Sequence, residues 1–74
     1  MNKFIFIEDK KEYSFKFTKT DNDFFIYMVC SYENGFHGCE RSLSDFRNYE
    51  DMSPYLSKNA HEYCLRIIKI LAFL

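Results

Sequence analysis

The sequence predicts an α+β fold, an antiparallel sheet of three to four strands packed against one or two C-terminal helices. In the first half of the chain, apolar and polar residues alternate with the period of two that indicates strands. Near the end, apolar residues recur at the i, i+3/i+4 spacing of an amphipathic helix. The strand signals all precede the helix signals, and the 74 residues suffice for a single domain spanning 1–74.

The first three strands are predicted over residues 3–8, 12–20 and 23–33. The first contains the β-forming run FIFI, and the second alternates Tyr13, Phe15 and Phe17 with polar residues. The third, with FFIYMVCSY, is apolar on both faces, which is typical of a central strand.

The dipeptide Asn34-Gly35 predicts a two-residue type I′ hairpin, because both central positions of that turn need positive φ. This turn would place Cys30 directly opposite Cys39, a pairing that would allow a cross-strand disulfide under oxidation. The partner strand, 36–41, is short and polar, so we expect it at an edge of the sheet.

Two helical segments are expected after the strands. The run Ser42-Leu43-Ser44-Asp45 resembles a capping box and predicts a helix over about 43–51. Ser53-Pro54 then offers an N-cap and a first helical position for a helix over about 54–73, and Asn59, with Glu62 three residues on, offers a second cap. Its apolar face would hold Ala60, Tyr63, Cys64, Ile67, Ile68, Leu71 and Leu74, and its polar face Glu62, Arg66 and Lys69.

The net charge is −1, but the charges are unevenly distributed along the chain. Residues 21–57 hold seven acids against two arginines. A nucleic-acid-binding protein is expected to carry a basic stripe, whereas an acidic field suits a protein partner with a basic surface. A weak nucleic-acid-binding module remains an alternative, through the lysines of the first strands: Lys3, Lys10, Lys11, Lys16 and Lys19.

The sequence favours a cytoplasmic protein. The start has four consecutive apolar residues, fewer than the ~7–15 of a signal peptide. No stretch approaches the ~20 apolar residues of a membrane span. Three cysteines without CxxC spacing favour free thiols in a reducing compartment.

We expect no enzyme activity, no metal and no cofactor. Cys30, His37 and Cys39 would share one face, and Cys64 or His61 would complete four soft ligands. However, their spacing is not that of a zinc finger or ribbon. Cysteine catalysis is also disfavoured, because two residues along a strand are ~6–7 Å apart and the two glycines offer no oxyanion-hole loop.

Acids and aromatic rings alternate in the segment DFRNYEDMSPY, residues 45–55. Tyr and Phe are enriched in the cores of protein interfaces, so this segment is a candidate binding surface. The alternative is a solvated helix whose rings point inward. The predicted partner-binding residues are Asp45, Tyr49, Glu50, Asp51 and Tyr55.

The final segment IIKILAFL, residues 67–74, is almost wholly apolar. Four outcomes are open: burial against the protein's own sheet, burial in a homodimer, exposure by truncation, and shallow membrane association. The residues predicted to form an oligomer contact are Ile67, Ile68, Leu71, Phe73 and Leu74.

The order of segments resembles the first half of small bacterial immunity proteins of the WapI-inhibitor type. It runs through FIFI, EYSFKF, FFIYMVCSY, a short hairpin partner and SLSDFRNYEDMSPYLSKNAHEYCL, about residues 4–65. The sequence departs from that pattern because no Trp closes the third strand and a second β-rich half is missing. The resemblance implies no particular functional residue.

The resemblance does imply a non-catalytic protein that binds another protein. We therefore expect an inhibitor, of the immunity or anti-defence type, that acts by occupying a target. The alternatives are a homo-oligomerising structural subunit built through the C-terminal helix and the nucleic-acid module described above.

Overall fold

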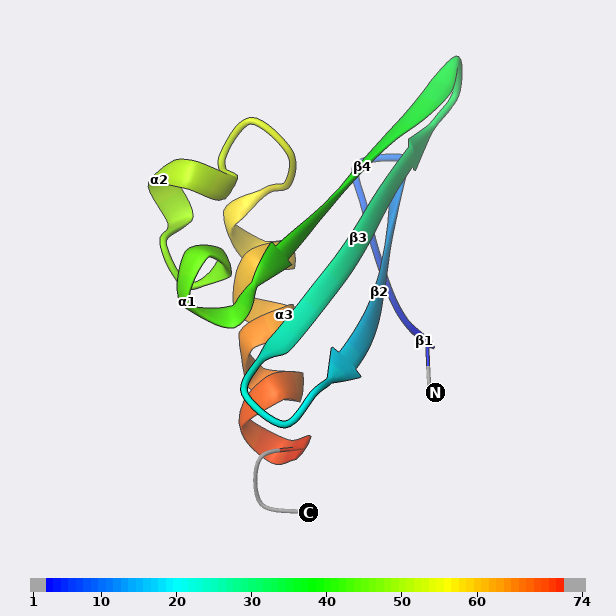
Figure 1. The fold of residues 1–74 in the computed structure, drawn as a ribbon. Helices are drawn as coiled ribbons and strands as arrows, with labels where there is room; N and C mark the ends of the chain where they lie inside the picture. The colour runs from blue at the N-terminus through cyan, green and yellow to red at the C-terminus, as the bar shows by residue number, and fades with distance from the viewer. Residues whose placement is uncertain (1–2, 72–74) are drawn as a thin grey trace.

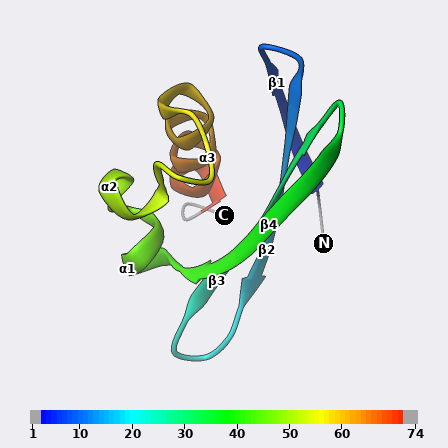
Figure 2. The same cartoon turned by 90° about the horizontal axis from the view of Figure 1, so that it is seen from above.

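A computed structural model, which describes residues 3–71, has the α+β architecture expected from the sequence. Within these described residues, four antiparallel strands form one sheet, and the three helices lie on one side of it (Figures 1 and 2). The elements in chain order are β1 (Lys3–Glu8), β2 (Lys11–Lys19), β3 (Phe24–Tyr32), β4 (Gly35–Ser42), α1 (Leu43–Phe46), α2 (Tyr49–Met52) and α3 (Lys58–Leu71).

The sheet is a meander in which each strand pairs with its neighbour in sequence, in the order β1-β2-β3-β4. Glu8 pairs with Lys11, so Asp9 and Lys10 form the two-residue turn between β1 and β2. Both turn residues have positive φ, 51° and 64°, as a type I′ turn requires. The turn after β2 is held by the Asp23 amide, which donates to Thr20 Oγ1 at 3.0 Å.

The register between β3 and β4 differs by two residues from the sequence prediction. Cys30 pairs with His37, and Cys39 pairs with Met28, so the predicted pairing of Cys30 with Cys39 is wrong. The loop residues are Glu33 and Asn34, and no glycine among residues 3–71 has positive φ. A two-residue shift leaves every side chain on its original face, so the hydrophobic pattern does not distinguish the two registers.

The core lies between the inner face of the sheet and the helices. The strands contribute alternate residues of β2 and β3, among which Phe15 and Met28 are completely buried. Among residues 3–71, the buried hydrophobic residues are Tyr13, Phe15, Phe17, Ile26, Met28, Cys30, Phe46, Met52, Leu56, Ala60, Cys64 and Ile68. Rings pack on rings at the centre: Phe15 meets Phe46 edge to face, with centroids 6.5 Å apart.

The helical layer is broken into shorter pieces than the sequence indicates. The predicted cap at Ser42 is confirmed, because Ser42 Oγ accepts from the Asp45 amide at 3.4 Å. α1 ends at Phe46, and α2 follows separately. The last helix begins at Lys58, later than the residue 54 predicted, because Ser57 acts as its cap: Ser57 Oγ accepts from the Ala60 amide at 3.1 Å.

The amphipathic character of α3 is as predicted over the described residues. Ala60, Cys64 and Ile68 are buried against the sheet, whereas Glu62 and Lys69 are exposed. Apolar residues three or four positions apart therefore form the face that packs on the core. Leu74, the last residue of the predicted apolar face, lies outside the described residues.

Candidate protein-binding surface

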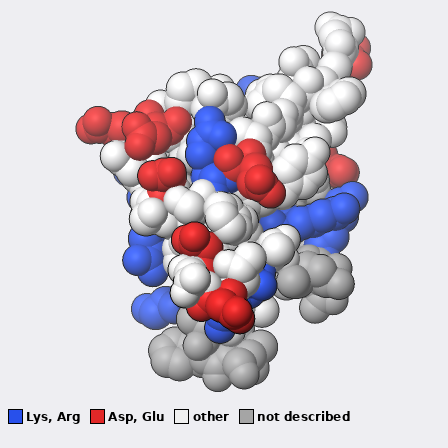
Figure 3. All heavy atoms as spheres, viewed as in Figure 1, with Lys and Arg blue, Asp and Glu red and all other residues white. Residues whose placement is uncertain are grey.

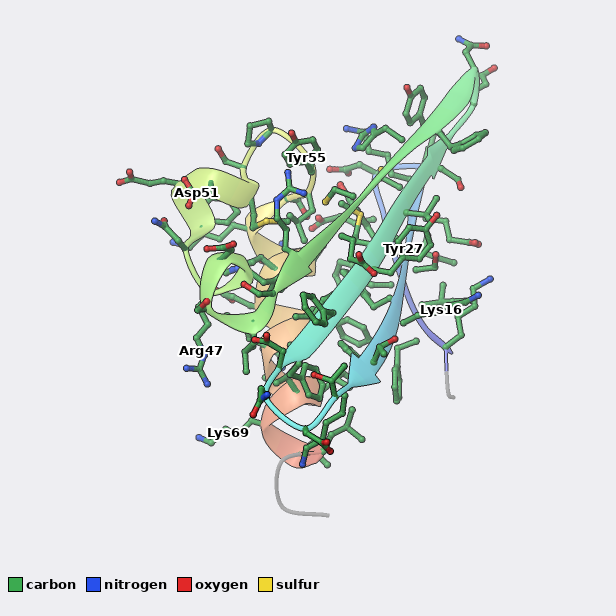
Figure 4. The ribbon with its side chains drawn as sticks, viewed as in Figure 1. Lys16, Tyr27, Arg47, Asp51, Tyr55 and Lys69 are labelled. Atoms are coloured by element: carbon green, nitrogen blue, oxygen red, sulfur yellow. The ribbon has the colours of Figure 1, made fainter. Side chains whose placement is uncertain are left out.

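The predicted acidic segment forms the outermost part of the helical layer. Asp45 belongs to α1, and Glu50 and Asp51 belong to the first turn of α2; all three are exposed. Figure 3 shows acidic side chains gathered over α2 at the margin of the molecule. Figure 4 shows that Asp51 points away from the sheet into solvent. We call the three carboxylates and the neighbouring Tyr49 and Tyr55 the acidic surface.

Local caps fix the backbone beneath these acids. Asn48 Oδ1 accepts from the Glu50 amide at 3.0 Å, which starts α2. Ser53 Oγ donates to the Glu50 carbonyl at 3.1 Å, which closes it. These bonds use the main chain of Glu50, so its carboxylate is free of the capping interactions that hold the helix.

The ring of Tyr49 is half-buried and packs on a buried histidine. The centroids of the Tyr49 and His61 rings lie 5.2 Å apart. His61 also stacks on Phe46 at 5.0 Å, and its Nε2 donates to the Phe46 carbonyl at 2.6 Å. A carbonyl oxygen only accepts, so Nε2 of His61 is the donor. His61 thereby joins α3 to the end of α1 and fixes the position of Tyr49.

Tyr55 lies in the loop between α2 and α3 and is held by β4. His37 Nε2 donates to the Tyr55 carbonyl at 2.9 Å, and the two rings are 6.2 Å apart. The guanidinium carbon of Arg41 lies 5.3 Å from the centroid of the Tyr55 ring, which is a cation–π distance. Thus both predicted tyrosines are half-buried and each is supported by an imidazole.

A cavity of about 210 Å³ opens beside these two rings. Its walls come from the β2–β3 part of the sheet, β4 and the loop before α3, and several of its lining groups are polar. The lining residues include Lys11, Tyr13, His37, Tyr49, Tyr55 and Ser57. The cavity therefore adjoins the two tyrosines of the acidic surface, whereas its three carboxylates are not among the lining residues.

The structure separates the residues predicted to form an oligomer contact. Ile68 is buried in the protein's own core, and Ile67 and Leu71 are half-buried against it. Phe73 and Leu74 lie outside the described residues. Ile70, which the sequence reasoning did not select, is the exposed apolar residue of this part of α3. An oligomer contact at the end of the chain stays a prediction.

The three cysteines are free thiols in hydrophobic surroundings. Burial raises the pKa of Cys30, and nearby Lys11 and the Tyr13 hydroxyl only partly oppose this. Burial also raises the pKa of the Cys39 thiol, against the weaker influence of Arg41, and that of Cys64. A raised pKa keeps a thiol protonated at neutral pH, which disfavours nucleophilic chemistry. Within residues 3–71, no three His, Cys, Asp or Glu side chains are grouped to hold a metal.

The acids and tyrosines were selected from the sequence as candidate binding residues, but the groups that hold the two tyrosines were not. His61, His37 and Arg41 come from α3 and β4, distant in sequence from the residues they support. The isolated histidines gave no local signal, because their role depends on which carbonyl the fold places within reach.

Comparison with known proteins found no matching family model, no matching curated protein and no matching solved structure. In the part of the chain that the structure describes, no helix is sufficiently long and apolar to traverse a membrane.

Proposed function

We propose that this chain is a small cytoplasmic protein-binding protein, an inhibitor that acts by occupying a basic surface of a target protein. The observation that carries the proposal is the acidic surface: Asp45, Glu50 and Asp51 are exposed beside tyrosines that other elements hold in place. Opposite charges at an interface steer encounter and select partners, and anchored rings supply contact area.

The anchoring of the two tyrosines matters for affinity. Binding normally costs the conformational freedom of side chains that become fixed in the interface. Tyr49 is already packed on His61, and Tyr55 contacts His37 and Arg41. Little further ordering of these rings is needed when a partner covers them, so the surface is prepared for binding.

The immunity or anti-defence role rests on the resemblance to WapI-inhibitor-type proteins and on the small size of the chain. Proteins of that kind need a stable surface complementary to one target and no chemistry of their own. The high pKa of the thiols agrees with a role that does not use them as nucleophiles.

The double substitution Glu50→Lys with Asp51→Lys tests the proposal. We expect it to weaken capture of the native partner at least tenfold, because it reverses two charges that would face basic groups. The measurement is affinity purification of the tagged protein from its own host, with quantitative mass spectrometry. Binding of the recovered partner to both forms is then measured by calorimetry.

The matched control is Asp21→Lys with Glu62→Lys, which changes the net charge equally at exposed positions outside the acidic surface. This control should retain the partner. Equal loss in both variants would show that total charge governs binding, and retention in both would place the binding surface elsewhere.

A further inference from the structure

The outer face of the sheet, opposite the helices, carries an exposed apolar set. Ile7 and Phe36 are 69% and 75% exposed, and Ile5 and Tyr27 are 45% and 46% exposed. Figure 4 shows Tyr27 and Lys16 on the side of the sheet away from Asp51 and Lys69. Among residues 3–71, no element covers this face.

The strand register arranges this face in rows across the sheet, from β1 to β4. The first row is Lys3, Lys16, Tyr27 and Glu40. The second is Ile5, Ser14, Val29 and Gly38. The third is Ile7, Glu12, Ser31 and Phe36. The basic and acidic ends of the first row thus lie on opposite edges, and each edge of the third row carries a large apolar side chain.

We propose that a second copy of the chain covers this face, sheet against sheet, about a two-fold axis that runs parallel to the strands between β2 and β3. Such an axis lays β1 of each copy over β4 of the other and β2 over β3. The interface is isologous, so every contact occurs twice. Two twisted sheets pack in this aligned manner with their strands about 30° apart.

Charge complementarity supports the second copy as the occupant. The axis places Lys3 of each copy over Glu40 of the other, which forms two intermolecular ion pairs. Lys16 of each copy lies over Tyr27 of the other, where a cation–π contact can form. Within one copy, Lys3 and Glu40 stand on the two edge strands, three strand spacings or about 14 Å apart. They therefore cannot pair with each other inside one chain.

The apolar residues match under the same operation. Ile7 of one copy lies over Phe36 of the other, so the two most exposed apolar side chains cover each other. Ile5 lies over Gly38, which has no side chain and leaves room for it. The alternative two-fold axis, perpendicular to the strands, would lay Lys16 over Glu12, but at the two edges of the sheet it would press Lys3 on Ile7 and Glu40 on Phe36. That arrangement buries charges against apolar groups and is disfavoured.

The size of the face indicates a weak dimer. Four strands are about 19 Å wide and six residues of strand about 20 Å long, so each face covers about 380 Å² and the two copies together bury roughly 760 Å², below the range of stable specific interfaces. We therefore expect association that depends on protein concentration. The acidic surfaces of the two copies would face outward on opposite sides, so the dimer is independent of the proposed function.

Two charge reversals test the dimer. Lys3→Glu and Glu40→Lys each place like charges together twice, so each variant alone is expected to be monomeric by sedimentation equilibrium at concentrations where the native protein dimerises. An equimolar mixture of the two variants should regain the dimer mass, because each reversed side chain then faces an opposite charge. Circular dichroism of each variant confirms that it is folded.

The controls are Lys69→Glu and Asp51→Lys, which make the same charge changes on the helical side of the molecule and should leave the mass unchanged. Phe36→Ser, at an exposed position, should weaken the dimer at least tenfold without loss of folding. A native protein that is monomeric up to millimolar concentration overturns the proposal. So does a mixture that stays monomeric, or a dimer lost on Ile70→Asp but retained in both charge reversals.

Discussion

Gly38 has no Cβ, and this allows β4 to pair closely with β3. A Cβ built on this residue would stand 2.8 Å from the Met28 carbonyl oxygen and 3.3 Å from Val29 Cγ2. The first contact is with backbone, which has no free rotation to relieve it. The glycine is needed here because β4 approaches β3 closely, and not because of an unusual φ.

Gly38→Ala is expected to destabilise the protein by about 1–3 kcal/mol, because the added methyl forces the two strands apart. Urea unfolding followed by circular dichroism measures the change. The matched control is Gly35→Ala, where the added Cβ would meet the Tyr32 ring at an ordinary 3.6 Å. Equal losses in the two variants would contradict the role given to close strand approach.

At the scale of elements, Glu8 connects the first hairpin to the last helix. Its Oε1 accepts from the Ser57 hydroxyl and its Oε2 from the Asn59 amide, each at 2.6 Å. Ser57 is also the cap of α3. The two hydrogen bonds favour the ionised carboxylate, so they lower the pKa of Glu8, and burial opposes them only weakly.

Removing this carboxylate is expected to make stability less sensitive to acid. A lowered pKa in the folded state stabilises the protein above the ordinary value of 4.5, and this contribution is lost as pH falls through the folded pKa. Glu8→Ala should therefore be less stable than the native protein at pH 7. The difference in free energy of unfolding should shrink as the pH falls below 4.5. Urea unfolding between pH 7 and pH 3 measures it.

Asn59→Ala provides the control for this connection. Alone it should destabilise the protein, and in the Glu8→Ala background it should cost nothing more, because its partner is already gone. A stability difference between native protein and Glu8→Ala that stays constant down to pH 3 would contradict the hydrogen-bond account.

The position of a strand or helix was predictable where the local sequence pattern determines it. It was not predictable where contacts with distant residues determine it. Phe15 and Phe17 alternate with polar residues, and that period alone locates β2. The start of α3 was predicted at residue 54 with a second cap at Asn59, whereas in the fold the cap is Ser57, whose hydroxyl also bonds to Glu8. The hairpin register was missed because Asn34-Gly35 is only a local preference, whereas Gly38 must lie beside Met28 and Val29.

On the scale of the whole molecule, the two faces have different characters. The helical side carries the exposed acids Asp45, Glu50 and Asp51. Their exposure was predictable from the sequence because Asp and Glu side chains are rarely buried. The outer sheet face carries Ile7 and Phe36, which the sequence reasoning did not select. Their exposure depends on the helices all packing on the other side, which local pattern does not specify.

The meander order has a consequence for the time course of folding. Each strand joins its neighbour through a short loop, so the sheet forms from local contacts, which fold quickly. The bond of Ser57 to Glu8 closes 49 residues of chain and is expected to form after the sheet. Ser57→Ala, which costs about 1 kcal/mol, should then speed unfolding about fivefold and leave the folding rate nearly unchanged.

Stopped-flow folding and unfolding in urea measures both rates. Phe15→Leu, in the central pair of strands, is the contrasting variant and should slow folding. If Ser57→Ala slows folding by the larger factor, α3 docks before the sheet is complete. β1 and α3 would then meet first, and the hairpins would form inside an already closed loop.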